Sequence, residues 1–280
     1  MKVSVIIPVY NEERVIRECL KSLTKQTYKD MEVIVVDDGS TDSTLSVITD
    51  LRFKNYDLRI YKQKHVGPGV ARNLGAKHAS GEILVFVDAD MTFDHDFIKE
   101  LVMPIVVGKS KGTWSREEYV SNNDNIWSQC WGINEGWEKG KRHPKNYPNE
   151  QKVFRAILKS EFEKVRGFDS GGHYTDDWSL SEKLGYMATA APGAKFYHEN
   201  PGALYEVFSG SKWAAKRKYK LGILGMLGGL VRVSLPISLL VGMIMAITHN
   251  QSQFLIFKIV YDTGAFFGIL EYMFLGKGEK

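Results

Sequence analysis

The chain has 280 residues, 44% of them hydrophobic and 25% charged, which suits a folded protein with a sizeable core and excludes disordered and fibrous classes. Its 37 Lys and Arg residues only slightly outnumber its 33 Asp and Glu residues, so the charge does not indicate a nucleic-acid-binding protein. The two cysteines, Cys19 and Cys130, predict neither a disulfide framework nor a Cys-x-x-Cys metal site, and they favour a reducing, cytosolic site of action.

Apolar runs alternate with amphipathic segments through the first 95 residues. The apolar runs predict strands over residues 3–9, 31–36, 58–61 and 83–87. Helices are predicted over residues 12–25, 41–51 and 69–79, the first of them capped by Asn11. Because apolar strands alternate with helices, we expect an α/β fold with a mostly parallel central sheet covered on both faces. Ligands of such sheets bind at the carboxyl ends of the strands.

Two pairs of carboxylates follow predicted strands at those ends. Asp88 and Asp90 stand at i and i+2 after residues 83–87, a spacing that can hold one hard divalent cation and a ribose hydroxyl. Mg²⁺ and Mn²⁺ take oxygen ligands and bridge to phosphates, so either ion would neutralise a departing diphosphate. By itself this spacing is more typical of loop aspartates that cap a helix. The second pair, Asp37 and Asp38, precedes Gly39 at the end of another strand and favours a ligand site.

Four segments, in this order and spacing, resemble family 2 glycosyltransferases with the GT-A fold. They are residues 5–12 (VIIPVYNE), 35–42 (VVDDGSTD), 69–73 (GVARN) and 88–90 (DAD). The match covers the family's nucleotide-binding half, roughly residues 1–95.

The resemblance implies a role for individual residues of this half. The implied nucleotide-donor site consists of Pro8, Tyr10, Glu12, Asp38, Arg72 and Asp88. In it Asp38 holds the base or ribose, and Arg72 approaches the donor. Asp90 is implied as the principal metal ligand, and Asp88 faces the ribose or sugar beside that metal.

A second acidic pair stands at Thr175-Asp176-Asp177-Trp178 and resembles the family's acidic motif, often Glu-Asp, whose second carboxylate is the general base. An acceptor hydroxyl is a poor nucleophile until its proton is removed. We therefore predict Asp177 as the base and Asp176 as its partner in the catalytic pair. The competing interpretation is a helix cap, because residues 179–184 are predicted to be helical and Asp176 could be their N-cap.

His198 lies in residues 196–201 (FYHENP), which resemble a segment whose histidine approaches the metal from the opposite side. A neutral imidazole is an acceptable third ligand for Mn²⁺, although a lone histidine is more often structural. His198 is therefore predicted in the metal site with Asp90 and Asp88.

The Gln-x-x-Arg-Trp motif of processive polysaccharide synthases has no clear match, which favours transfer of one sugar per visit.

The composition changes near residue 211 to a basic cluster followed by an apolar tail. The cluster consists of Lys212, Lys216, Arg217, Lys218 and Lys220. Residues 221–248 contain one charge, Arg232, and residues 254–275 form a second apolar segment in which Lys258 and Asp262 could pair on one helical face. We predict a C-terminal hydrophobic helical hairpin that spans the membrane or lies in its interface, with both ends cytosolic. A buried or dimer-forming helical pair is the competing interpretation.

These features predict a membrane-attached, inverting glycosyltransferase that uses Mg²⁺ or Mn²⁺. It would move a sugar from a nucleotide diphosphate sugar to a hydroxyl of a glycan or lipid-linked acceptor, at the cell membrane with the catalytic domain on the cytosolic side and no nucleic-acid partner. Residues 1–210 are predicted as the GT-A domain, with a nucleotide-binding half (1–95) and an acceptor half (96–210), and residues 211–280 as the membrane-associated part. Three alternatives stay open: transfer to a polyprenyl phosphate, a nucleotidyltransferase, and a non-catalytic membrane-bound protein that binds nucleotide sugars.

Overall fold

The computed structural model describes residues 1–51, 57–169, 176–217 and 219–275. Its contacts divide the chain into two compact units. Unit 1 comprises Met1–Tyr119 and Asn146–His198, and unit 2 comprises Val120–Lys145 and Glu199–Lys280. The division differs from the predicted one, because residues 120–145 join the C-terminal helices and the predicted boundary at residue 210 falls inside helix α8 (Leu204–Ala215).

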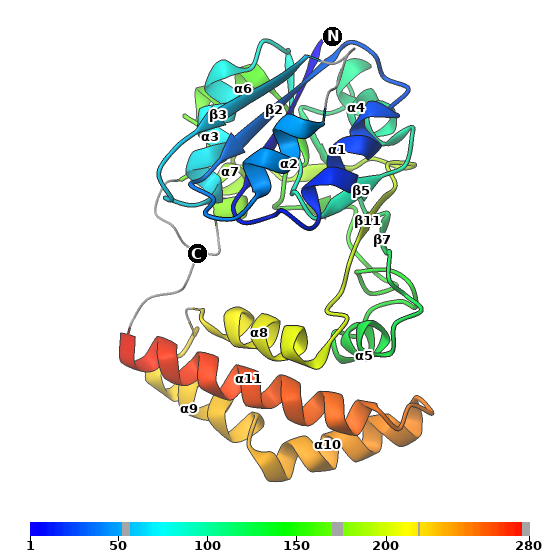
Figure 1. Cartoon of the computed structure of the whole chain (residues 1–280), viewed down its shortest axis with the longest axis vertical. Helices are drawn as coiled ribbons and strands as arrows, with labels where there is room; N and C mark the ends of the chain where they lie inside the picture. Colours follow the sequence, from blue (N-terminus) through cyan, green and yellow to red (C-terminus); the bar gives the residue numbers. More distant parts are fainter. Residues whose placement is uncertain (52–56, 170–175, 218, 276–280) are drawn as a thin grey trace. The chain divides into compact units, whose positions relative to one another are not determined.

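Unit 1 is built on a central twisted sheet, of which β2 and β3 are labelled in Figure 1. Its strand order is β3-β2-β1-β4-β9-β6-β10-β8. Its strands are β1 (Val3–Val9), β2 (Met31–Asp37), β3 (Leu58–Lys62), β4 (Ile83–Phe86), β6 (Gly112–Trp114), β8 (Glu150–Gln151), β9 (Ala156–Leu158) and β10 (Ala188–Ala190). Strand β1 pairs in parallel with β2 and β4, and β2 pairs in parallel with β3. Strand β9 is antiparallel to both β4 and β6. The predicted parallel order therefore holds for β1 to β4, and the whole sheet is mixed.

Helices cover both faces of this sheet, as the apolar runs predict. They are α1 (Ile16–Thr24), α2 (Thr44–Asp50), α3 (Pro68–His78), α4 (Phe97–Val106), α6 (Lys159–Lys164) and α7 (Asp176–Leu184). Val5 and Ile7 of β1 enter one core with residues of α1, α2 and α4, whereas Ile6 enters a second core with residues of α3, α6 and α7. Since successive side chains of a strand point to opposite faces, a strand buried on both faces reads as a continuous apolar run.

A small second sheet completes unit 1 next to the end of β4. It has the order β5-β11-β7, formed by β5 (Met91–Phe93), β11 (Phe196–His198) and β7 (Glu118–Val120). Strands β5 and β11 are antiparallel, with His198 opposite Met91. This pairing joins the segment after the Asp88-Ala89-Asp90 motif to a segment more than a hundred residues later in the chain.

The first helix begins later than predicted. Helix α1 starts at Ile16, and Asn11 takes a left-handed conformation with φ of 57°. Its side-chain oxygen accepts a hydrogen bond from the Thr41 backbone N–H at 2.8 Å. Asn11 therefore ties the loop after β1 to the loop after β2 and does not cap a helix.

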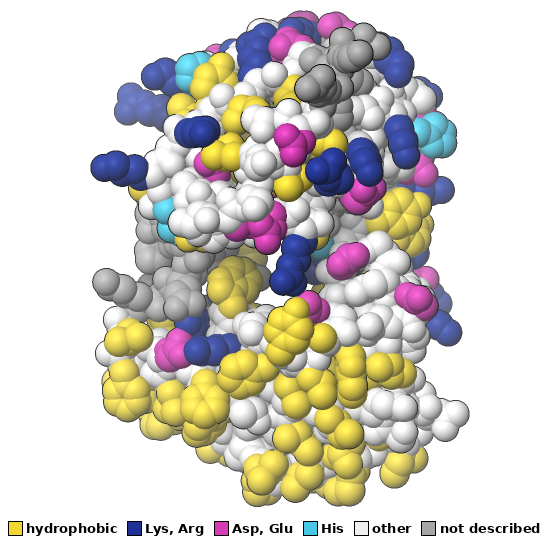
Figure 2. Space-filling view, in the orientation of Figure 1, with side chains coloured by type: hydrophobic (Ala, Val, Ile, Leu, Met, Phe, Trp, Pro, Cys, Tyr) yellow, Lys and Arg dark blue, Asp and Glu magenta, His cyan; other side chains and the backbone are white. Residues whose placement is uncertain are grey.

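Unit 2 consists of the helices α5 (Ile126–Asn134), α8, α9 (Gly222–Arg232), α10 (Leu235–Thr248) and α11 (Phe254–Leu275). Gly264 and Gly268 of α11 let α8 approach closely, because a Cβ atom on either would lie within 2.4 Å of the Phe208 or Lys212 backbone oxygen. Trp131 of α5 packs edge-on against Phe257 of α11. Hydrophobic side chains gather over α9 to α11 in Figure 2.

The predicted apolar segment 221–248 forms two helices, α9 and α10, which meet at an angle of 58°. Within the described ranges no single helix is long and apolar enough for a membrane span, whereas this bent pair taken together has sufficient length and composition. Lys258 and Asp262 form the predicted i,i+4 pair, with Nζ 2.8 Å from Oδ1.

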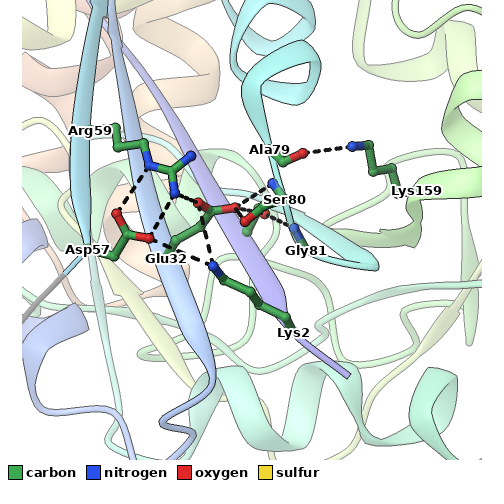
Figure 3. A network of polar contacts seen from close by, with 9 residues as sticks. Lys2, Glu32, Asp57, Arg59, Ala79, Ser80, Gly81 and Lys159 are labelled. Atoms are coloured by element: carbon green, nitrogen blue, oxygen red, sulfur yellow. Dashed lines mark hydrogen bonds and ion pairs between the residues drawn. The ribbon is translucent and has the colours of Figure 1, made fainter.

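Glu32 organises the end of the sheet opposite the carboxyl ends of the parallel strands (Figure 3). Its fully buried carboxylate accepts hydrogen bonds from the hydroxyls of Ser4 at 2.6 Å and Ser80 at 2.8 Å. Arg59 Nη2 lies 3.0 Å from its other oxygen, and Lys2 approaches from the start of β1. Burial opposes ionisation, but the hydrogen bonds and the Lys2 charge outweigh it and lower the pKa of Glu32. The contacts join β1, β2, β3 and the turn before β4.

We expect Glu32→Gln to reduce the free energy of unfolding at neutral pH by about 1–3 kcal/mol, because a buried charged network loses its acceptor. A lowered pKa in the folded state means that the ionised carboxylate stabilises the fold above its ordinary pKa of about 4.3, and that this contribution is lost as the pH falls further. Denaturant unfolding of both proteins from neutral to acidic pH should show the difference shrinking. A difference that stays constant down to acidic pH would contradict this assignment.

Candidate functional site

The candidate site lies where β1, β2 and β4 end at one edge of the sheet. Their parallel register places Val9 opposite Asp37, and Ile6 opposite Phe86. The residues that directly follow these strands are therefore neighbours. They are Tyr10 and Glu12 after β1, Asp38 after β2, and Asp88 and Asp90 after β4.

Asp88 is held between two guanidinium groups. Arg72 of α3 donates from Nη2 to Oδ1 at 2.8 Å, and Arg155 donates from Nη1 to Oδ2 at 3.0 Å. Burial raises the pKa of the carboxyl, but the charges of Arg155 and Arg72 outweigh it and hold the pKa of Asp88 well below its usual range. Asp88 therefore stays ionised and holds the guanidinium groups of Arg72 and Arg155 at the site. Its predicted contacts with a sugar and a metal stay predictions.

Asp90 faces the imidazole of His198 across the β5–β11 pairing. His198 Nε2 lies 2.7 Å from Asp90 Oδ2, and its Nδ1 lies 3.1 Å from Glu118 Oε1 of β7. The other Asp90 oxygen, Oδ1, is buried and has no hydrogen-bond partner among the described residues. A buried carboxylate oxygen without a partner is costly, which makes it a candidate position for a bound cation.

The pKa of Glu12 is sensitive to the negative charge of the neighbouring carboxylates. Burial, then Asp90, Asp88 and Asp42, raise the pKa of Glu12 to about 7, while His198 opposes the shift. The carboxylates of Asp90 and Asp88 therefore create a negative potential that reaches across to the loop after β1. A divalent cation would reduce that potential.

These groups fit a divalent cation that completes its coordination from a substrate. No set of three Asp, Glu, His or Cys side chains already forms a ligand cage in the described ranges. Asp90 Oδ1 would provide one hard oxygen ligand. His198 Nε2 would provide one nitrogen ligand if the cation replaced its contact with Asp90 Oδ2. Such a pair suits Mn²⁺, and Mg²⁺ commonly uses one or two carboxylates plus phosphate oxygens. The assignment of these residues as metal ligands stays a prediction.

The carboxylate of Asp38 accepts hydrogen bonds from the segment between β3 and α3. It accepts hydrogen bonds from the backbone N–H of Val66 at 3.0 Å and of Gly67 at 2.8 Å, and from Gln63 Nε2 at 2.6 Å. His65 Nδ1 lies 2.9 Å from Oδ2. Asp38 thus fixes the segment before α3, and its predicted contact with a base or ribose stays a prediction.

Tyr10 is an exposed ring stacked on His65, with ring centroids 3.8 Å apart. Both rings stand beside the loop that Asp38 fixes. An exposed aromatic face can accept a flat ring such as a nucleobase, and the predicted place of Tyr10 in the nucleotide pocket stays a prediction. Pro8 lies within β1 opposite Val36 and is half-buried.

Asp176 and Asp177 open helix α7, and their side chains lie outside the described part of the chain, as does Thr175. The helix is anchored in unit 1 by Leu180, which is fully buried, and by Ser179, whose hydroxyl accepts from the Asp169 backbone at 3.1 Å. The predicted base and the alternative helix cap both stay predictions.

Asn73 of α3 holds the chain segment that leads toward α7. Its amide donates to the Phe168 carbonyl and accepts from the Phe168 backbone N–H, each at 2.9 Å. Gly167, next to Phe168, has φ of 73°, and a Cβ atom there would meet Asn73 Oδ1 at 2.3 Å. Asn73 therefore links the helix that carries Arg72 to the approach to the acidic pair.

Three members of this site, Arg155, Glu118 and His65, are not predicted by the sequence. Arg155 reaches Asp88 because β9 pairs antiparallel with β4, and Glu118 reaches His198 through the small sheet. Neither pairing has a local sequence signal. His65 lies two residues before Gly67, between the predicted strand that ends at residue 61 and the predicted helix that begins at residue 69.

Comparison with known proteins identifies the family. The model for "Glycosyl transferase family 2" matches residues 4–166, which is more than half of the chain. A curated relative, the poly(ribitol-phosphate) beta-glucosyltransferase of Bacillus spizizenii, is 42% identical over 124 residues, covering 40% of this chain and 19% of that protein. Curated relatives such as this one are thus much longer than the segment they share with the chain.

Two solved structures share the GT-A fold with this chain. The Pyrobaculum calidifontis mannosyltransferase PcManGT, in complex with GDP-Man and Mn²⁺, has a TM-score of 0.60 at 19% identity and covers 99% of this chain and 88% of that chain. Staphylococcus aureus TarS 1-349, in complex with UDP-GlcNAc, has a TM-score of 0.59 at 19% identity, covering 99% and 93%. At these identities the likeness shows the fold.

We expect Asp90→Asn to lower the pKa of Glu12 from about 7, because the substitution removes the largest neighbouring negative charge. The pKa should stay above the ordinary value, since burial remains. Carboxyl-detected NMR titration of metal-free protein measures this shift, with Asp50→Asn on the exposed face of α2 as the matched control. An unchanged Glu12 pKa in Asp90→Asn would show that the two carboxylates are not coupled.

Proposed function

Because this chain belongs to glycosyl transferase family 2 and carries a glycosyltransferase domain, we propose that it moves a sugar, with inversion, from a nucleotide diphosphate sugar to a hydroxyl of a glycan or lipid-linked acceptor. The observation that carries this proposal is the joint placement of Asp90, His198 and the Asp88-bound arginines at the carboxyl edge of the sheet. Such an edge gathers both a cation site and fixed positive charge where a diphosphate would lie.

The donor is proposed as a nucleoside diphosphate sugar. Relatives of known structure hold GDP-Man and UDP-GlcNAc, so the proposal covers both purine and pyrimidine donors. Tyr10 offers its exposed ring to the base, and the loop fixed by Asp38 borders it. Arg72 and Arg155 would approach the diphosphate, with Asp88 orienting both guanidinium groups.

Mg²⁺ or Mn²⁺ is the proposed cofactor, held by Asp90 Oδ1 and His198. When bound, the cation neutralises the charge that develops on the departing nucleoside diphosphate. The Mn²⁺ in the mannosyltransferase structure supports the choice of a divalent ion. Glu118 faces the other ring nitrogen of His198 at 3.1 Å and would orient the imidazole, as carboxylates do for many ligating histidines.

Asp177 is the proposed general base. It would take the proton of the acceptor hydroxyl as that oxygen attacks the anomeric carbon from the face opposite the diphosphate, which inverts the configuration. The acidic pair at the start of α7 and the anchoring of that helix by Leu180 and Ser179 support this role.

We also propose that unit 2 attaches the chain to the cell membrane and leaves the catalytic domain on the cytosolic side.

We expect chelation to abolish sugar transfer, and Asp90→Ala to lower turnover by about 10²-fold or more even with excess Mn²⁺, because a preorganised electrostatic contribution is lost. Release of nucleoside diphosphate from a donor panel measures the rate. Asp50→Ala, an exposed carboxylate on α2, is the control. Full activity of Asp90→Ala in a chelated buffer would rule out the metal proposal, and release of pyrophosphate would identify a nucleotidyltransferase.

Asp177→Asn keeps the size of the side chain but cannot accept a proton, so turnover should fall by about 10² to 10⁴ while donor affinity is retained. Asp176→Asn should cost less if that residue only orients its neighbour or caps the helix. Donor affinity and turnover of both variants are compared at one metal concentration.

Three results would reassign the acidic pair. Normal turnover of Asp177→Asn with a dead Asp176→Asn would move the base by one residue. Near-normal turnover of both would favour a polyprenyl phosphate acceptor, which is already an anion and needs no base. Donor binding without turnover in the unmodified protein, across a broad acceptor panel, would favour a non-catalytic binding protein.

A further inference from the structure

Helices α9 and α10 expose an almost entirely aliphatic surface. The exposed side chains, here called the aliphatic face, are Ile223, Leu224, Leu227, Val231, Leu235, Leu239, Leu240, Met243, Ile244 and Ile247. Those of α10 recur at helical spacing along one side of the helix, and Ile247 is 80% exposed. In Figure 2 hydrophobic side chains form a broad patch over this part of unit 2. A patch this large on a folded chain indicates a surface that is covered by something else.

The charged side chains of α11 are turned into unit 2 and away from this face. Lys258 pairs with Asp262, whose other oxygen accepts from Ser238 of α10 at 2.7 Å. Glu271 pairs with Lys212 and Lys216 of α8. The charges of α11 are thus paired, either within the helix or with α8. Most exposed aliphatic side chains of unit 2 lie on α9 and α10.

Along the chain, the segment that carries the aliphatic face has charges of one sign. Residues 207–261 contain no Asp or Glu, and Arg217, Lys220 and Arg232 are exposed before and at the end of α9. Cations beside an apolar helical face match an anionic lipid surface, which attracts Lys and Arg and accepts aliphatic side chains. A second copy of the chain fits less well, because two such faces would bring like charges together.

The dimensions of the two helices determine how they would meet the lipid. Helix α9 has 11 residues and α10 has 14, lengths of about 16 Å and about 21 Å against a hydrocarbon layer of about 30 Å. They meet at 58°, and both present aliphatic side chains on their exposed sides. We propose that α9 and α10 lie in the plane of one leaflet of an anionic membrane, with the aliphatic face immersed and α11 above it. The inference sharpens the attachment proposed above and does not depend on the transfer reaction.

Flotation of the full chain with vesicles tests the surface. The chain should float with vesicles of phosphatidylcholine and phosphatidylglycerol, and more weakly with phosphatidylcholine alone. The double variant Leu240→Asp/Ile244→Asp should lose binding, and Arg217→Gln/Lys220→Gln/Arg232→Gln should weaken it by about tenfold or more on anionic vesicles. Val107→Asp, which alters a comparably exposed apolar residue at the end of α4 in unit 1, should bind normally.

Depth measurements separate an in-plane anchor from a span. A fluorescent probe is attached to Leu235→Cys, Leu240→Cys or Ile247→Cys, with the native protein as background because Cys19 and Cys130 are buried. Quenching by lipids brominated at different depths should place all three probes at one shallow level. A depth that changes steadily along α10 would overturn the proposal in favour of a span.

Two further results would also overturn the in-plane anchor. The first is absence of vesicle binding. The second is a stable dimer that Leu240→Asp/Ile244→Asp dissociates, because a second copy would then cover the face. Nucleoside diphosphate release by the same preparations, measured with a soluble acceptor, reports the transfer reaction separately, so failure of one proposal is distinguishable from failure of the other.

Discussion

The parallel pairing of β1 with β2 and β4 is the constraint on which the candidate site depends. Three strands that run in the same direction end at one edge, so short loops from different parts of the first ninety residues become neighbours there. The strands are held in this register by cores on both faces and, at their opposite ends, by the contacts of Glu32. Rigid strand ends let loops present polar groups with little freedom, which is a requirement for electrostatic preorganisation.

The site combines an excess of negative charge with two guanidinium groups that Asp88 holds in place. Asp88 is paired with Arg72 and Arg155. Burial, followed by the charges of Asp90 and Asp88, raises the pKa of Glu12. Two carboxylates separated by one residue therefore have different electrostatic surroundings. An ion and a diphosphate, one positive and one negative, would each find a complementary region within the same edge.

The sequence predicted those parts of the fold that local pattern controls. Strands β1 and β2 and helix α3 lie within one or two residues of their predicted bounds, because apolar runs and helical spacing act locally. The predicted start of α1 was wrong because the Asn11 side chain accepts a hydrogen bond from Thr41. Helix propensity does not predict a contact between two loops. The positions of Arg155 and Glu118 at the site depend on strand pairings between distant segments, so no local sequence motif predicts them. His198 was predicted beside Asp90 from a resemblance, and the pairing of β11 with β5 brings the two side chains together.

The interleaving of the two units affects how the chain can be made and shortened. Residues 120–145 find partners in α11 and in the turn before it. Gln251 of that turn donates to Gln129, 122 positions earlier, and Tyr261 of α11 donates to Glu135, 126 positions earlier. During synthesis this segment must therefore wait, with Trp131 uncovered, until more than a hundred further residues have left the ribosome. Chains cut short before Phe257 would lack the ring that packs against this indole, and exposed aromatic surface of this kind makes incomplete chains prone to aggregate.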